Sequence, residues 1–305
     1  MIAPEHEQVS EGFDAGEVII GHVSNTTPDH AIVHLPTIFG IDFSITKHVL
    51  MIWMVALIVF LAVTWAVRRT VRKGDLVPTG FANAVEAIVQ YIRDSIVLPN
   101  VGPKFVGLWT PLILTFFFFI VSCNAFGLIP LFDVIGALDR FILHTAHTSF
   151  INRIIHGGTT ATGNFNVTAA LAMITFFSII IAGSRAHGFF KHWKNMVQPG
   201  LPWWVYIILI PIEILGMLVK PFALTMRLAA NMTGGHVAIL VILSFVFIFT
   251  GLFHSALAGI GVGAVVAVPL AVGISALEII VVLVQAYVFT LLSAVFIGMA
   301  INVHH

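Results

Sequence analysis

The chain has 305 residues, of which 59% are hydrophobic and only 9% are charged, against about 25% charged in ordinary soluble proteins. Several apolar runs exceed the ~20 residues that a helix needs to cross a bilayer, so the sequence predicts an all-α integral membrane protein. The formal net charge is zero and no basic tail is present, which argues against nucleic acid as a partner. The single cysteine, Cys123, excludes an internal disulfide.

The first 47 residues form an acidic arm, with seven acidic residues and one base, Lys47. No basic region precedes an apolar stretch here, so no signal peptide is expected. A first span is predicted at about 48–67, and four bases follow it within residues 68–73. Basic loops remain on the cytoplasmic side, so the arm is expected outside, with residues 48–305 forming one membrane domain.

Residues 79–98 have the pattern of an amphipathic helix. Apolar side chains recur there at helical spacing, at Phe81, Val85, Ile88, Ile92 and Ile96. Polar side chains occupy the other faces, namely Glu86, Gln90, Arg93 and Asp94. We expect this helix to lie on the cytoplasmic surface of the membrane, and a soluble helix packed on a partner is the alternative.

Two further spans are predicted at about 105–129 and 166–183, joined by a polar outside loop. The bases in residues 184–194 mark the cytoplasmic side again, which agrees with the first basic loop. The loop histidines between residues 144 and 156 lack nearby cysteine or carboxylate, so no metal site is expected. We find no phosphate-binding glycine loop with its lysine, and we expect neither a cofactor nor catalysis by the chain alone.

The last third contains two very long apolar runs, at about 203–252 and 256–301. A helix of 45 residues extends about 68 Å, more than twice the hydrocarbon thickness. Either each run folds into two spans, or each is one strongly tilted helix, which is the interpretation we prefer. Pro211, Pro221 and Pro269 allow kinks, and Gly259 with Gly263 allows close helix packing.

Arg227 is the most informative residue of these runs. An arginine keeps its proton, and placing this charge at membrane depth costs roughly 3 kcal/mol or more. Glu213, Lys220 and Arg227 are seven residues apart, so on a helix they form one stripe, with Asn231 on the same side. Snorkelling is the preferred role of Lys220, with a direct functional role as the alternative. Interhelical hydrogen bonding is the alternative to a functional role for Asn231.

Glu278 and Gln285 in the final run are also seven residues apart and share a helix face. If the two runs pair antiparallel with Gln285 level with Arg227, Glu278 falls within two residues of His236. This arithmetic predicts an acid–imidazole pair on the outer side of the arginine. Ionisable residues at membrane depth are typical of proton or ion routes, although Gln285 could equally serve as an interhelical hydrogen-bonding residue.

Four segments together resemble subunit a of the F-type ATP synthase. They are Lys220-Pro221 with Arg227-Leu228, Asn231-Met232 and Gly235; Glu278 with Gln285-Ala286; residues 124–130 (Asn-Ala-Phe-Gly-Leu-Ile-Pro); and residues 166–168 (Asn-Val-Thr). The resemblance covers about residues 48–302. Residues 1–40 and 137–160 contain no segment that contributes to it.

The resemblance implies five membrane helices, with the last two long and strongly tilted against a ring of c subunits. It implies two proton half-channels, an outside N-terminus, a cytoplasmic C-terminus and a bacterial inner membrane. Peripheral-stalk b subunits, lipid and, indirectly, a catalytic head are the other implied partners. The implied site residues are Arg227, facing the ring carboxylates; Asn231, His236, Glu278 and Gln285, lining the outer half-channel; and Glu213, near the cytoplasmic route.

In many bacterial members an acid follows the arginine by nine residues and a histidine occupies the last-helix position. Here the order is reversed, with His236 after the arginine and Glu278 in the last run, as in mitochondrial and related alphaproteobacterial forms. The long acidic arm, which mitochondrial members lack, favours a bacterial protein. A swapped pair preserves its chemistry only where the two residues are neighbours.

Three other functions fit the residues less well. A secondary transporter with a midplane arginine is typically built from two similar halves, and we find no repeat. A proton-channel subunit of a respiratory complex would need charged residues in several spans, whereas here they concentrate in the last two runs. A purely structural scaffold leaves the aligned charges unexplained.

Overall fold

The computed structural model describes residues 33, 35–38, 41–42, 44–73, 79–128, 160–195, 202–253 and 255–302. Most of the acidic arm and the loop histidines lie outside these residues. The described residues divide into two compact units. The larger unit contains the described residues up to Met232 and those from Ile279 onward, and the smaller unit contains Thr233–Glu278.

The described chain begins with a short antiparallel hairpin, in which β1 (Thr37–Ile38) pairs with β2 (Ile41–Asp42). An isolated bridge between Val33 and Ile45 extends this pairing. Helix α2 (Lys47–Lys73) follows and ends in the predicted basic cluster. The first predicted span is therefore a single apolar helix.

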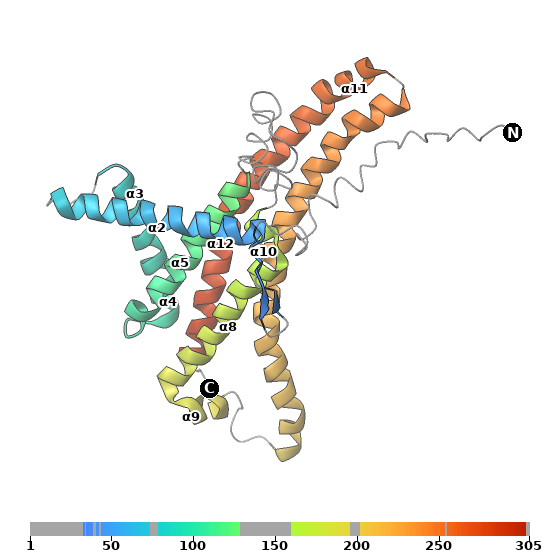
Figure 1. Cartoon of the computed structure of the whole chain (residues 1–305). Helices are drawn as coiled ribbons and strands as arrows, with labels where there is room; N and C mark the ends of the chain where they lie inside the picture. The colour runs from blue at the N-terminus through green and yellow to red at the C-terminus, as the bar shows by residue number, and fades with distance from the viewer. Residues whose placement is uncertain are drawn as a thin grey trace. The chain divides into compact units, whose positions relative to one another are not determined.

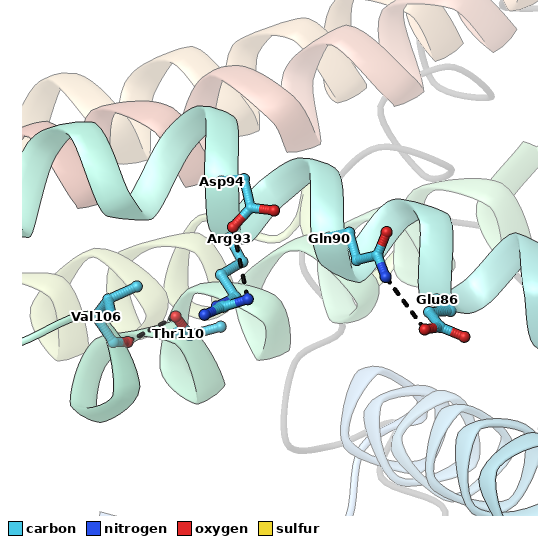
Figure 2. A network of polar contacts seen from close by, with 6 residues as sticks. All are labelled: Glu86, Gln90, Arg93, Asp94, Val106 and Thr110. Atoms are coloured by element: carbon cyan, nitrogen blue, oxygen red, sulfur yellow. Dashed lines mark hydrogen bonds and ion pairs between the residues drawn. The ribbon is translucent and has the colours of Figure 1, made fainter. Parts of the chain in front are cut away.

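The predicted amphipathic helix is present as a run of α3 (Phe81–Tyr91), the π-helix η2 (Ile92–Val97) and α4 (Leu98–Val101). Val85, Ile92 and Ile96 of its apolar side are buried, whereas Phe81 and Ile88 are exposed. Its polar side forms local contacts, with Gln90 donating to Glu86 at 3.1 Å and Arg93 lying 3.7 Å from Asp94 (Figure 2). The helix and its polar face agree with the pattern of the sequence.

The second and third spans are α5 (Val106–Leu128) and α8 (Phe165–His187). A 3-10 turn, η4 (Ala161–Gly163), precedes α8, and the side chain of Asn164 caps this helix by accepting from the backbone N–H of Asn166 at 2.9 Å. After α8 the chain reverses at Gly188, whose φ of 89° is readily adopted only by glycine. The short helix α9 (Phe189–Asn195) follows.

The two long apolar runs are continuous helices, as we preferred, and not pairs of spans. The first is α10 (Trp203–Leu252), which Pro211 and Pro221 do not interrupt (Figure 1). The second run consists of α11 (Ala256–Val262), the π-helix η5 (Gly263–Ala267) and α12 (Val268–Ile301). With these, the described residues contain five helices long and apolar enough to cross a membrane, which confirms the predicted fold class.

Each unit has its own apolar core. In the larger one, side chains of η2, α5, α8, α10 and α12 pack together, including an edge-to-face contact of Phe116 with Phe289 at 5.5 Å between ring centres. In the smaller one, Ile242, Ala267 and Ala271 form the core. The predicted small residues Gly259 and Gly263 there lie against Val246, so close that a side chain at 259 would meet its carbonyl oxygen.

Candidate functional site

The acid–imidazole pair predicted from the sequence is present in the smaller unit. His236 of α10 places its Nδ1 atom 3.0 Å from Oε1 of Glu278 on α12. The glutamate is 4% exposed, and the histidine is half-buried. The second carboxylate oxygen, Oε2, is also buried and has no hydrogen-bond partner within the described part of the chain. A buried carboxyl bonded through one oxygen only can accept or release a proton at the other.

Gly235 makes room for this pair. A Cβ atom built on Gly235 would lie 2.7 Å from Oε1 of Glu278 and 2.9 Å from its carboxyl carbon. The neighbouring Gly234 has nothing within 4 Å of the same position. The sequence motif contains Gly235 but does not indicate that this glycine leaves space for the Glu278 carboxyl group. The available signal was a pair of adjacent glycines inside a helix, where glycine costs about 1 kcal/mol relative to alanine.

A pair of amide side chains joins α10 to α12 in the larger unit. Asn231 donates from Nδ2 to Oε1 of Gln285 at 2.8 Å, and Gln285 is buried while Asn231 is exposed. The assumed register had placed Gln285 level with Arg227. The structure pairs Gln285 with Asn231 instead, which lies four residues, or about one helical turn, further along α10 than Arg227.

Arg227 and Glu213 of α10 both have exposed side chains. Within the described part of the chain, Arg227 has no hydrogen-bond or ion-pair partner. Its direction follows from the packing of the helix, because Leu224, Leu228 and Met232 recur every four residues and are buried in the core. Lys220 differs from both, since its Nζ atom lies 5.5 Å from the centre of the Phe296 ring, in a cation–π contact.

Residues 49–298 match the family model described as "ATP synthase A chain". The chain belongs to the ATP synthase A chain family. It is subunit a, the non-catalytic, proton-conducting stator subunit of the membrane sector. This finding confirms the resemblance stated above, and it disfavours the transporter, respiratory-complex and scaffold alternatives.

Curated relatives agree over most of the chain. "ATP synthase subunit a 2" of Chlorobium luteolum is 40% identical, with 98% of this chain and 80% of the relative covered. "ATP synthase subunit a" of Chlorobium phaeobacteroides is 37% identical, with coverages of 98% and 79%. "ATP synthase subunit a" of Myxococcus xanthus is 38% identical, with coverages of 87% and 75%. With five long apolar helices among its described residues, this subunit a is a multi-pass membrane protein.

The structure also reveals buried polar contacts in subunit a that sequence reasoning did not connect. Thr162 donates to the amide oxygen of Asn124, and both residues are fully buried. Thr175 and Ser293 share a hydrogen bond of 3.2 Å between α8 and α12. Asn124, Thr175 and Ser293 are polar positions in apolar runs, but spacing within one run cannot identify a partner 38 or 118 residues away. No three metal-ligating side chains cluster among the residues that the structure describes.

Proposed function

We propose that this subunit provides two proton half-channels and couples proton flow to rotation of a c-subunit ring. The observation that supports the proposal most strongly is the isolated charge of Arg227. It is exposed on an apolar helix and has no counter-charge within the described part of the chain. Because an unpaired charge at membrane depth is costly, a carboxylate from outside the chain is the partner that its chemistry requires.

Protons enter from the outside by way of His236 and Glu278. The 3.0 Å separation of Nδ1 and Oε1 is short enough for a proton to pass between the two side chains. Oε2 of Glu278 then exchanges that proton with the next group of the route. Asn231 and Gln285 line the same outer half-channel, where their amides can hydrogen-bond to the groups that carry the proton but do not titrate themselves.

A ring carboxylate that receives this proton becomes neutral and can turn into lipid, because burying an uncharged carboxyl avoids the cost of burying an ion. On its return it meets Arg227, whose positive charge favours the ionised form and drives proton release. Glu213 belongs to the cytoplasmic route. Each proton crossing releases about 2.3 kcal/mol per 100 mV, and ring torque transmits this energy to the catalytic head.

The proposed setting is a bacterial inner membrane with the N-terminus outside and the C-terminus in the cytoplasm. The bases that end α2, at residues 68–73, and those that end and follow α8, at 185–194, support this orientation. Peripheral-stalk b subunits are the further partners.

The test is Arg227→Ala in the assembled complex. ATP-driven proton pumping, followed by quenching of a pH-sensitive dye in inverted membrane vesicles, should fall below detection while the complex still assembles. Arg93→Ala is the matched control, because Arg93 is also an exposed arginine but is paired with Asp94 at 3.7 Å. Normal coupled pumping by the Arg227→Ala complex would overturn the proposed role.

A further inference from the structure

Helix α9 is held against the basic end of α8 by a buried histidine. The chain reverses at Gly188, and the imidazole of His192 then lies where a side chain on Gly183 would be, with Nδ1 only 2.1 Å from a Cβ built there. Gly183 is four residues before the end of α8, or about 6 Å along the helix. Helix α9 therefore lies at the level of the last turn of this membrane-spanning helix.

Aromatic and basic side chains are both exposed along this reversal. Phe189, Phe190 and Trp193 are 58%, 87% and 40% exposed. Arg185 and Lys191 are exposed beside them in the sequence. We call these five residues the α9 patch. Aromatic rings with lysine or arginine are typical of the boundary between lipid headgroups and acyl chains.

Among the residues that the structure describes, the bases of the α9 patch have no acidic partner. The sequence contains no aspartate or glutamate from residue 140 to residue 212. Within the described part of the chain, neither Arg185 nor Lys191 takes part in an ion pair. Arg93 on η2 is different, because Asp94 lies 3.7 Å away (Figure 2). The patch thus has uncompensated positive charge next to exposed apolar rings.

The imidazole of His192 contributes packing, not charge. Burial, together with the nearby His187, lowers the pKa of His192, so its imidazole stays neutral near pH 7. His187 hydrogen-bonds through Nε2 to the carbonyl oxygen of Ile301, the last residue of α12, at 2.9 Å. His192 therefore packs α9 against α8, and His187 joins the end of α8 to the end of α12.

We propose that the α9 patch binds the headgroup of an anionic phospholipid. Arg185 and Lys191 contact the lipid phosphate, for which guanidinium and ammonium groups are suited. The exposed aromatic rings insert between the acyl chains next to it. This site is independent of the proton route, since it uses none of the residues assigned to the half-channels. Lipid binding at the α9 patch anchors the chain reversal after α8 and, through His187, the end of α12.

Photo-crosslinking of lipid to the whole ATP synthase tests this proposal. The complex is placed in nanodiscs of phosphatidylcholine with a small fraction of photoactivatable phosphatidylglycerol, and labelled peptides are identified by mass spectrometry. We expect labelling within residues 185–195, and competition by unlabelled phosphatidylglycerol but not by phosphatidylcholine. Removing two bases in the double variant Arg185→Gln, Lys191→Gln should weaken this competition roughly thirtyfold, at about fivefold for each base.

Two control variants separate charge from folding. Arg93→Gln removes a base that already has an acidic partner and should leave the competition unchanged. The double variant Arg185→Lys, Lys191→Arg keeps both charges and should retain most of the affinity. Equal labelling by phosphatidylcholine and phosphatidylglycerol analogues would overturn the proposal. So would an absence of labelling in residues 185–195 of the wild-type complex, which would mean that another subunit covers the patch.

Discussion

The two groups of polar residues in the long helices differ in how their charge is satisfied. His236 and Glu278 are bonded to each other, and the glutamate is almost fully buried. Arg227 and Glu213 are exposed, and Arg227 has no partner within the described part of the chain. A pair satisfied within the chain can work as a local proton relay, whereas the exposed, unpaired charge of Arg227 is available to a carboxylate of another subunit, as we propose. Arg227 and His236 thus differ in chemistry although both lie on α10.

Single changes within the His236–Glu278 pair should give the largest loss of proton pumping, and exchanging the two residues should reverse part of it. His236→Glu alone and Glu278→His alone each leave two like groups in contact, and pumping should fall on the order of 100-fold, a typical contribution of a positioned proton-transfer group. The combined exchange restores one acid and one imidazole and should recover at least a tenth of the pumping. Proton pumping in inverted vesicles is the measurement, and no recovery in the double variant would show that the residues act separately.

Gly235→Ala should give the next largest effect. Its methyl group would lie 2.7 Å from Oε1 of Glu278, so the carboxylate must move, and pumping should fall on the order of tenfold. The fold should tolerate the change, because the displaced atoms belong to a flexible side chain. Gly234→Ala is the matched control, since nothing lies within 4 Å of its Cβ position. Equal pumping by the two variants would contradict the assigned role of Gly235.

The Asn231–Gln285 hydrogen bond should contribute modestly to stability. A double-mutant cycle with Asn231→Leu and Gln285→Leu should give a coupling free energy of about 0.6 kcal/mol, the average for hydrogen bonds between membrane helices. Thermal unfolding of the full-length subunit in detergent is the measurement. A coupling energy of zero would mean that the 2.8 Å contact does not persist in solution.

The smallest expected effect is on the free energy of unfolding, after substitution of the exposed residue Arg227. Arg227→Met should change the unfolding free energy of the isolated full-length subunit by less than about 0.5 kcal/mol, because the side chain is exposed and has no hydrogen bond or ion pair to lose among the described residues. Glu278→Leu should cost about 1–3 kcal/mol, because it leaves the imidazole of His236 without its partner. Similar losses for both variants would remove the distinction between the two regions.

The sequence by itself determined the architecture, because long apolar runs in a bilayer have few alternatives to helices. It also identified the polar residues, since each one interrupts an apolar run, and a seven-residue spacing is enough to align Glu278 with Gln285. The reversed order of His236 and Glu278 is a property of the sequence alone. Basic clusters after two spans gave an orientation, which remains a prediction.

The tertiary structure decided which of these residues meet. Register between two helices depends on how their side chains pack, so the partner of Gln285 is Asn231, about one turn from the level assumed for Arg227. The same packing buries Leu224 and Leu228 and thereby directs Arg227 outward. Contacts such as Gly235 with Glu278 and Gly183 with His192 join different helices. Residue spacing along one helix determines its faces, but only the packed neighbours determine what each face contacts.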